Sequence, residues 1–405
     1  MRVWIVNPFD NLPLEGNRPQ RYWLMARAFA RAGHEVTFWT SSFSHAHKAP
    51  RAFVTDEAAK LKGRAVGPDV WQVDGFRLVL IPTLPYRRNI SLVRIRSHRA
   101  LARSWAKRVE SEEVPDVVIA SSPPLGLCAA ARDYCAARRI PFVVDVMDAW
   151  PETFQRVVPK FVLAPLARTA RANYRSACVI SAVAARYLDL VRSYGATAPA
   201  RLFYHGIERA ASEANVQPST RHEGVTLVYA GNMSASYDLS TVITAVKELS
   251  DVTLELAGTG PDETALRALA ANSPRIRFHG YLAETPLRML LARADVGVVP
   301  MFHASCVGVP YKLADYAAAG LPILNSLEGE TADLISEHHA GESYTAGSVS
   351  SFIAALARLR VRDMARLRAG ALHLATRFDA ATVYGEYVAW IESQVTGSLK
   401  REASK

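Results

Sequence analysis

The chain has 405 residues, half of them hydrophobic and about a fifth charged, so it is long enough for two folded domains and too apolar for a disordered protein. No apolar run reaches the roughly 18 residues that a membrane-spanning helix needs, and the first residues lack the pattern of a signal peptide, so we expect a cytoplasmic protein. The formal net charge of +10 favours an anionic partner, which could be nucleic acid, a phosphorylated substrate or a membrane surface.

The first half of the chain alternates short β-branched runs with helical patterns. A helix is expected at residues 19–32, with Pro19 near its first turn and Gly33 at its end. Strands are expected at residues 3–7, 35–40, 117–120, 142–146 and 178–181. This alternation is typical of a parallel sheet covered by helices.

Between about residues 194 and 224 the alternation lapses, and glycine and proline become frequent, as in a linker between domains. The alternation then restarts. The strands expected here are at residues 225–230, 252–257, 275–279, 296–299 and 322–324. Two doubly wound units in tandem would face each other across a cleft, and ligands bind such sheets at the carboxyl ends of their strands.

Four cysteines, at positions 128, 135, 178 and 306, are widely spaced and form no C-x-x-C pair. This spacing is typical of reduced thiols and argues against a zinc site or a redox motif. We therefore expect no bound metal.

Glycines follow three of the strands expected in the second half. Gly231 ends the first, Gly258 and Gly260 follow the second, and Gly280 ends the third. Glycine at such a turn lets backbone N–H groups approach a phosphate closely, although plain tight turns use glycine too. No full G-x-G-x-x-G is present, so a nicotinamide or flavin site is not supported.

A lysine stands in the first turn of the helix expected after Pro310. The helix dipole disfavours a cation there. A diphosphate bound to Lys312 and to the adjacent N–H groups would reverse that unfavourable interaction. Asp315 lies three residues further on the same face, where it could accept hydrogen bonds from both ribose hydroxyls. The alternative is a local surface ion pair between the two side chains.

The order of these segments resembles glycosyltransferase family 4. The resemblance covers most of the chain and rests on these segments: 7–17, 33–37, 141–152, 229–232, 257–261, 277–281, 294–300 and 308–323. It implies a GT-B fold, made of two Rossmann-like doubly wound domains facing a central cleft. It also implies no metal or other cofactor, a nucleotide-sugar donor and retention of the anomeric configuration.

The chain departs from the family pattern at three points. Many members carry two glutamates eight positions apart, where this chain has Val307 and Asp315, and the usual Arg and Lys are missing from residues 232–237. The chain resembles the subgroup with the signature P-[SY]-K-L-x-[ED]-Y, which is common in cell-surface polysaccharide pathways. In that subgroup the diphosphate would be bound by Lys312 and the glycine turns.

The long loop at residues 8–18 would lie under the donor phosphate and the reacting sugar, as it does in the family. Gly16 and Asn17 could offer N–H groups and Arg18 a cation, although an ordinary loop after a strand is the alternative. The donor-binding residues expected in total are Gly16, Asn17, Arg18, Gly231, Asn232, Gly258, Gly260, Tyr281, Val309, Pro310, Tyr311, Lys312 and Asp315.

Two carboxylates, Asp145 and Asp148, follow the strand at 142–146 and are the candidate catalytic residues, because the family's active-site histidine is missing from this segment. Asp148 is the stronger candidate for contacting the acceptor hydroxyl, with capping of a short helix as the alternative. In the front-face mechanism the leaving diphosphate takes the acceptor proton, so no protein nucleophile is required. The scattered histidines, His45, His47, His98 and His205, are expected to be surface or core residues.

Residues 86–108 hold eight Lys or Arg, no Asp or Glu, and several apolar side chains. This composition favours contact with anionic lipid or with a lipid-linked diphosphate acceptor, and a solvated basic helix face is the alternative. The residues expected to contact the membrane or acceptor are Arg87, Arg88, Arg94 and Arg96. No nucleic-acid-binding module is recognisable, so nucleic acid is not an expected partner.

Together these observations favour a retaining glycosyltransferase of hexosyltransferase type. It would move a sugar from a nucleotide-diphosphate donor to a lipid-linked or polysaccharide acceptor at the inner face of the cell membrane. A sugar-nucleotide epimerase and a non-catalytic nucleotide- or lipid-binding module are the alternatives. The expected domains are residues 1–200 for the acceptor, residues 201–375 for the nucleotide sugar, and a helical segment at 376–405 that returns to the first domain.

Overall fold

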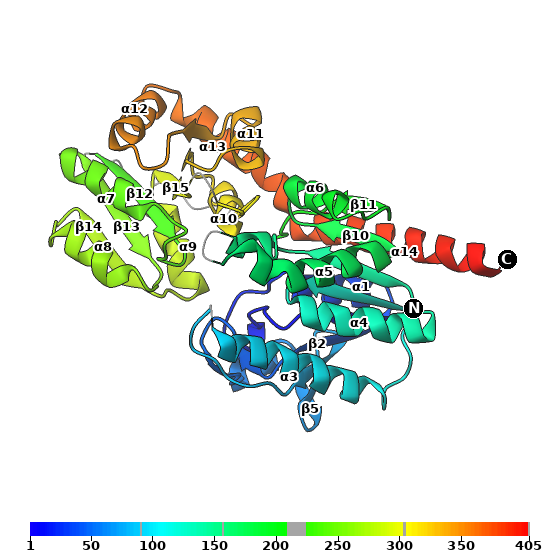
Figure 1. The fold of residues 1–405 in the computed structure, drawn as a ribbon. Helices are drawn as coiled ribbons and strands as arrows, with labels where there is room; N and C mark the ends of the chain where they lie inside the picture. Colours follow the sequence, from blue (N-terminus) through cyan, green and yellow to red (C-terminus); the bar gives the residue numbers. More distant parts are fainter. Residues whose placement is uncertain (90, 156–157, 209–223, 303–304, 404–405) are drawn as a thin grey trace. The chain divides into compact units, whose positions relative to one another are not determined.

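The computed structural model describes residues 1–89, 91–155, 158–208, 224–302 and 305–403 (Figure 1). The chain forms two compact units, one made of Met1–Gly206 with Ala380–Lys405 and the other of Ile207–Asp379. Of the expected linker, residues 209–223 lie outside the described residues. Its earlier part contains a strand that sequence analysis did not place.

The first unit is built on a sheet with the order β11-β10-β9-β8-β1-β2-β7-β6-β5. Its parallel strands are β1 (Arg2–Val6), β2 (Glu35–Ser41), β7 (Phe76–Ile81), β8 (Val117–Ser122), β9 (Phe142–Val146), β10 (Val179–Ala182) and β11 (Ala200–Leu202). At one edge β6 (Val70–Val73) and β5 (Arg64–Gly67) are antiparallel. A separate antiparallel pair is formed by β3 (Phe43–Ser44) and β4 (Ala49–Pro50).

Side chains that alternate along β1 divide the core of this unit into two layers. Val3 and Ile5 belong to the core that contains α1 (Arg21–Arg31) and α14 (Ala380–Ala403). Trp4 points to the other face, where its ring contacts Trp105 and Tyr134. Those rings come from α3 (Leu92–Val109) and α4 (Leu125–Arg138). The remaining helices of the unit are α2 (Thr55–Lys60), α5 (Lys160–Ser176), α6 (Ala185–Ser193), η1 (Pro13–Glu15) and η2 (Glu152–Phe154).

The second unit has a wholly parallel sheet with the order β14-β13-β12-β15-β16-β17. Its strands are β12 (Val225–Ala230), β13 (Val252–Ala257), β14 (Ile276–Gly280), β15 (Val296–Val299), β16 (Ile323–Asn325) and β17 (Gly341–Ser343). The direction of strand addition reverses between β12 and β15, as in the Rossmann fold, and ligands bind at the carboxyl side of such a reversal. The helices among its described residues are α7 (Leu239–Glu248), α8 (Glu263–Ala270), α9 (Glu284–Arg293), α10 (Tyr311–Ala318), α11 (Glu330–Glu337), α12 (Val349–Arg360), α13 (Met364–Ala375) and η4 (Thr376–Phe378).

The expected pair of parallel, helix-covered sheets is confirmed. Among the described residues, no helix has both the length and the apolar character that crossing a membrane requires.

Candidate active site

Lys312 is buried in the first turn of α10 and is enclosed by aromatic rings. Its Nζ lies 3.7 Å from the centre of the Tyr237 ring and 4.3 Å from that of the Tyr229 ring. It also donates a hydrogen bond of 3.3 Å to the Tyr229 hydroxyl. Burial lowers the pKa of Lys312 well below its ordinary value, and the charge of Asp315 only partly opposes this. An amine that has lost its water and faces two rings is prepared to receive an anion.

The Lys312 amine lies at the edge of the sheet where doubly wound folds bind their ligands. Tyr229 and Gly231 lie at the end of β12, and α10 follows β15, so the group stands at the reversal of strand order. A Cβ on Gly231 would lie 3.2 Å from the Lys312 Nζ. The backbone N–H of Ala230 donates to the Tyr316 hydroxyl at 2.8 Å, which fastens the end of β12 to α10.

The glycine turns pack against one another instead of presenting free N–H groups. Gly231 donates its N–H to the Ala257 carbonyl at 2.9 Å, and Gly258 donates to the Gly280 carbonyl at 2.6 Å. A Cβ on Gly258 would lie only 1.9 Å from the Gly231 oxygen, and one on Gly260 only 2.1 Å from the Met233 oxygen. The hypothesis that Gly231 and Gly258 offer N–H groups to phosphate is therefore corrected, because both donors are already used between adjacent strand ends.

The other expected donor-binding residues of this unit are distributed around the same edge. Val309 and Pro310 are buried before α10, and Tyr311 is partly exposed at its first position. Asp315 is partly exposed one turn after Lys312. Asn232 and Tyr281, by contrast, are exposed after β12 and β14.

In the first unit, the loop at residues 8–18 is held by its own hydrogen bonds. Gly16 ends η1 in the left-handed region and donates its N–H to the Pro13 carbonyl at 2.9 Å. Sequence analysis expected this N–H to bind the donor, but it is already used within the loop. Buried Asp10 accepts the N–H groups of Tyr22 and Trp23 at the start of α1. The other two candidates lie nearby. The Asn17 amide donates to the Leu12 carbonyl at 3.4 Å. Burial lowers the pKa of His205, and the charges of Arg21 and Arg18 lower it further.

Asp145 is fully buried in β9, and its carboxylate is saturated by hydrogen bonds. Arg21 donates to both of its oxygens at 2.8 Å. The hydroxyls of Tyr22 and Ser181 donate to it at 2.7 and 2.5 Å. The expected role at the acceptor is corrected, because the alternation of β9 turns this side chain into the core.

Asp148 lies beyond the end of β9 and organises the turn that follows. It accepts hydrogen bonds from the Ala149 N–H at 2.8 Å, and from Thr153 Oγ1 and Trp150 Nε1 at 3.2 Å. Burial raises the pKa of Asp148, and the nearby charge of Arg94 acts in the opposite direction. The short helix η2 has Pro151 at its N-cap and no side-chain cap hydrogen bond, so Asp148 orders the turn before the helix without capping it. A contact of Asp148 with acceptor stays a prediction.

Comparisons with known proteins bear on both units. Residues 20–205 match the glycosyl transferase 4-like domain, and residues 224–361 match the glycosyl transferases group 1 family. This chain is a group 1, family 4-like glycosyltransferase. The resemblance stated from its motifs is confirmed.

Solved structures show that the glycosyltransferase has the GT-B fold. A sucrose-phosphate synthase from Thermosynechococcus elongatus aligns with a TM-score of 0.71 at 13% identity, over 99% of each chain. The Anabaena protein HepE in complex with UDP aligns with a TM-score of 0.65 at 14% identity, over 97% of this chain and all of HepE. WaaG, a glycosyltransferase of lipopolysaccharide biosynthesis, aligns with a TM-score of 0.65 at 13% identity, over 96% of this chain and 98% of WaaG. No curated protein matches the chain.

Sequence analysis missed a group of aromatic and basic side chains in the first unit of the glycosyltransferase. The Phe9 ring centre lies 5.0 Å from that of His45 and 5.6 Å from that of His98. The His98 ring is in turn 6.1 Å from the Trp150 ring. These residues are far apart in the sequence, and only their positions after parallel strands of one sheet, or on α3, could have suggested that they meet.

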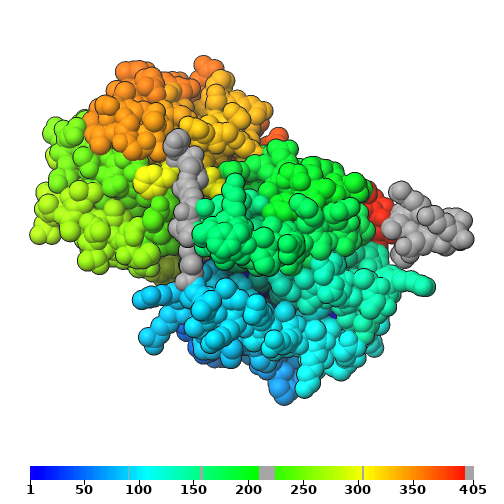
Figure 2. Space-filling view, viewed as in Figure 1, coloured from blue at the N-terminus to red at the C-terminus, as the bar shows by residue number. Residues whose placement is uncertain are grey.

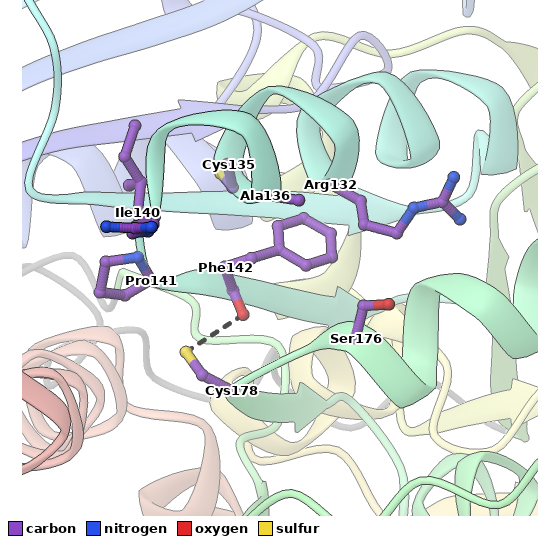
Figure 3. A pocket seen from close by; sticks show the side chains of 9 residues that line it. Arg132, Cys135, Ala136, Ile140, Pro141, Phe142, Ser176 and Cys178 are labelled. Carbon is purple, nitrogen blue, oxygen red and sulfur yellow. Dashed lines mark hydrogen bonds between the residues drawn. The ribbon is translucent and has the colours of Figure 1, made fainter. Parts of the chain in front are cut away.

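A hollow at the opposite edge of the same sheet is lined by residues other than these candidates. It lies at the amino ends of β9 and β10, and its lining includes Arg132, Cys135, Phe142 and Cys178 (Figure 3). The Cys178 thiol donates to the Phe142 carbonyl at 3.2 Å. Burial raises the pKa of the Cys135 thiol, so it is protonated and unreactive at neutral pH.

Proposed function

We propose that the enzyme transfers a hexose from a nucleoside-diphosphate donor to a lipid-linked or polysaccharide acceptor in cell-surface glycan assembly, with retention of configuration. The observation that supports the donor most directly is the buried Lys312 amine, enclosed by Tyr229 and Tyr237 at the strand reversal. HepE, which shares the fold, is described in complex with UDP and with UDP-glucose. Asp315 would bind the ribose of the same donor.

The chemistry that Lys312 would perform follows from its burial. Negative charge grows on the diphosphate as the sugar leaves, and a cation already stripped of water stabilises that charge without reorganising solvent. The arriving anion also raises the pKa of Lys312 again, so donor binding fixes the proton on Nζ. The leaving diphosphate would then accept the proton of the attacking hydroxyl, which removes the need for a protein nucleophile.

The donor proposal is tested by thermal unfolding of the enzyme with UDP, GDP and ADP, each beside its monophosphate. At 100 times its dissociation constant, a ligand stabilises by about 2.7 kcal/mol, which corresponds to roughly 5–10 °C for a unit of this size. We expect one diphosphate to raise the midpoint clearly more than its monophosphate. No shift with any diphosphate would contradict the proposal, and turnover of a sugar nucleotide without acceptor would indicate an epimerase instead.

We also propose that α3 and the segment before it contact an anionic membrane surface. Arg87, Arg88 and Arg96 are exposed, and Leu92 and Ile95 are exposed beside them on α3. Figure 2 shows the surface of this part of the chain in light blue. Arg94 was expected to contact the membrane or acceptor together with these arginines, but it lies on the inward face of the helix, which is formed by positions 94, 97, 101 and 105. Only the outward cations can reach lipid headgroups.

The variant with Arg87, Arg88 and Arg96 changed to Gln is therefore expected to bind anionic liposomes more weakly. Each basic residue near such a surface contributes about 1 kcal/mol, and salt screens the effect. Cosedimentation at low salt measures it. The matched control carries Arg31→Gln, Lys62→Gln and Arg64→Gln, which remove the same charge from exposed sites elsewhere in the unit. Equal loss in both variants would show a nonspecific charge effect.

A further inference from the structure

Four loops and one helix of the first unit bring aromatic and basic side chains together. Phe9 follows β1, His45 and Lys48 follow β2, Tyr86 follows β7 and Trp150 follows β9, while Arg94 and His98 come from α3. All four strands are parallel, so the loops meet at the carboxyl edge of the sheet, where ligands of such folds bind. Tyr86 is buried, and the other six side chains are partly exposed and can be reached from solvent.

The two cations of this group rest on ring faces. The Arg94 guanidinium lies 5.0 Å from the centre of the Trp150 ring and 5.7 Å from those of Phe9 and Tyr86. The Lys48 Nζ lies 5.0 Å from the centre of the Tyr86 ring. Rings attract a cation without neutralising it.

Both cations also donate hydrogen bonds to uncharged acceptors. Lys48 donates to Nδ1 of His45 at 3.2 Å and to the Asn89 amide oxygen at 2.6 Å. Arg94 donates to Nε2 of His98 at 3.4 Å and to the Asn89 carbonyl at 2.7 Å. Burial, together with these cations, lowers the pKa of each histidine to about 3, so both rings are neutral acceptors at physiological pH.

Negative charge is scarce around the two cations. The carboxylate of Asp148 attracts Arg94, but its oxygens already accept three hydrogen bonds. Neither Lys48 nor Arg94 forms an ion pair within the described part of the chain. Two partly desolvated positive charges at one sheet edge, neither of them held in an ion pair by a described residue, favour the binding of an anion here.

We propose that Lys48 and Arg94 bind a phosphate group of the acceptor, and that Phe9, Tyr86 and Trp150 form the wall against which the adjoining ring or isoprenoid unit packs. This inference rests on the proposed function, since it names the chemistry of the acceptor that the same enzyme would use. A lipid-linked diphosphate and a sugar phosphate both carry the phosphate, but the first carries an isoprenoid chain beside it and the second a sugar ring.

The test measures binding of geranyl diphosphate and of glucose 1-phosphate by calorimetry, with geraniol as the uncharged probe. It uses the full-length chain carrying Lys312→Met, so that the candidate donor site does not compete for phosphate. We expect at least one phosphate probe to bind and geraniol not to bind. Adding Lys48→Met or Arg94→Met should weaken that binding at least tenfold. Preference for geranyl diphosphate identifies a lipid carrier, and preference for glucose 1-phosphate identifies a phosphorylated glycan.

Arg103→Met is the matched control, because Arg103 is exposed on the same helix and should leave both affinities unchanged. In otherwise wild-type enzyme, Lys48→Met and Arg94→Met should leave nucleoside-diphosphate binding intact, which separates failure of this subsite from failure of the donor proposal. Their thermal midpoints should also stay near that of the parent. The inference is overturned if neither phosphate probe binds, if the two variants bind as well as the parent, or if they lose binding only by unfolding.

Discussion

Replacing Asp145 with alanine is expected to destabilise the first unit by about 3–5 kcal/mol, because it leaves the buried Arg21 guanidinium without its partner. Arg21 and Asp145 both have fully buried side chains. Arg21 also donates to the carbonyls of Phe203 and Tyr204, and its guanidinium lies 5.9 Å from the ring centres of Tyr384 and Tyr387 on α14. One ion pair thus connects α1, β9, the loop after β11 and α14.

Urea denaturation, followed by tryptophan fluorescence, measures this effect, since Trp4 and Trp23 are buried in the same unit. The double variant Arg21→Met with Asp145→Leu should recover much of the lost stability, because replacing a buried pair by apolar side chains is often neutral. A catalytic Asp145 would behave differently. Asp145→Ala would then fold as stably as wild type and lose only transferase activity.

Replacing Lys312 with methionine is expected to change donor affinity and stability in opposite directions. Loss of a charge-assisted hydrogen bond should weaken nucleoside-diphosphate binding by about 1.5–3 kcal/mol, or roughly 10- to 150-fold in dissociation constant. Without ligand the variant should be as stable as wild type or more so, because the buried amine is costly to desolvate and methionine fills similar volume.

Calorimetry with the best nucleoside diphosphate and thermal unfolding without ligand give the two readouts. Lys247→Met provides the matched control, since Lys247 is an exposed lysine of the same unit. If Lys312→Met lowered stability and left affinity unchanged, the amine would be a structural group of α10 and not part of a donor site.

The regular part of the fold could be predicted because its signals are local. The expected bounds of β9, β12, β13 and β15 agree with the structure, since each is a short, mainly apolar run between turn residues. The hairpin of β6 and β7 was missed, although Asp74 and Gly75, both with positive φ, form an Asp-Gly turn between apolar runs. Strands β11 and β17 span three residues each and are too short for periodicity to reveal.

The candidate sites could be predicted only in part, because their geometry depends on contacts between distant residues. Lys312 was found from its place in a helix, yet the rings that enclose it come from β12 and the loop after it. The pairing of Arg21 with Asp145 joins residues 124 positions apart, and no local pattern distinguishes such a carboxylate from a catalytic one. The expected domain boundaries stay predictions.

The return of α14 to the first unit has a consequence for how the chain folds on the ribosome. The second unit is inserted between Gly206 and Ala380, so the first unit lacks one of its core helices until that insertion has been translated. Until then, the nascent first unit exposes the surface that later receives Tyr384, Tyr387 and Ile391. Gly206 allows that helix to pack closely, because a Cβ there would lie 2.6 Å from the Tyr384 ring. Transiently exposed apolar surface makes partly folded chains prone to aggregate, so synthesis of the second unit prolongs the stage at which this surface is uncovered.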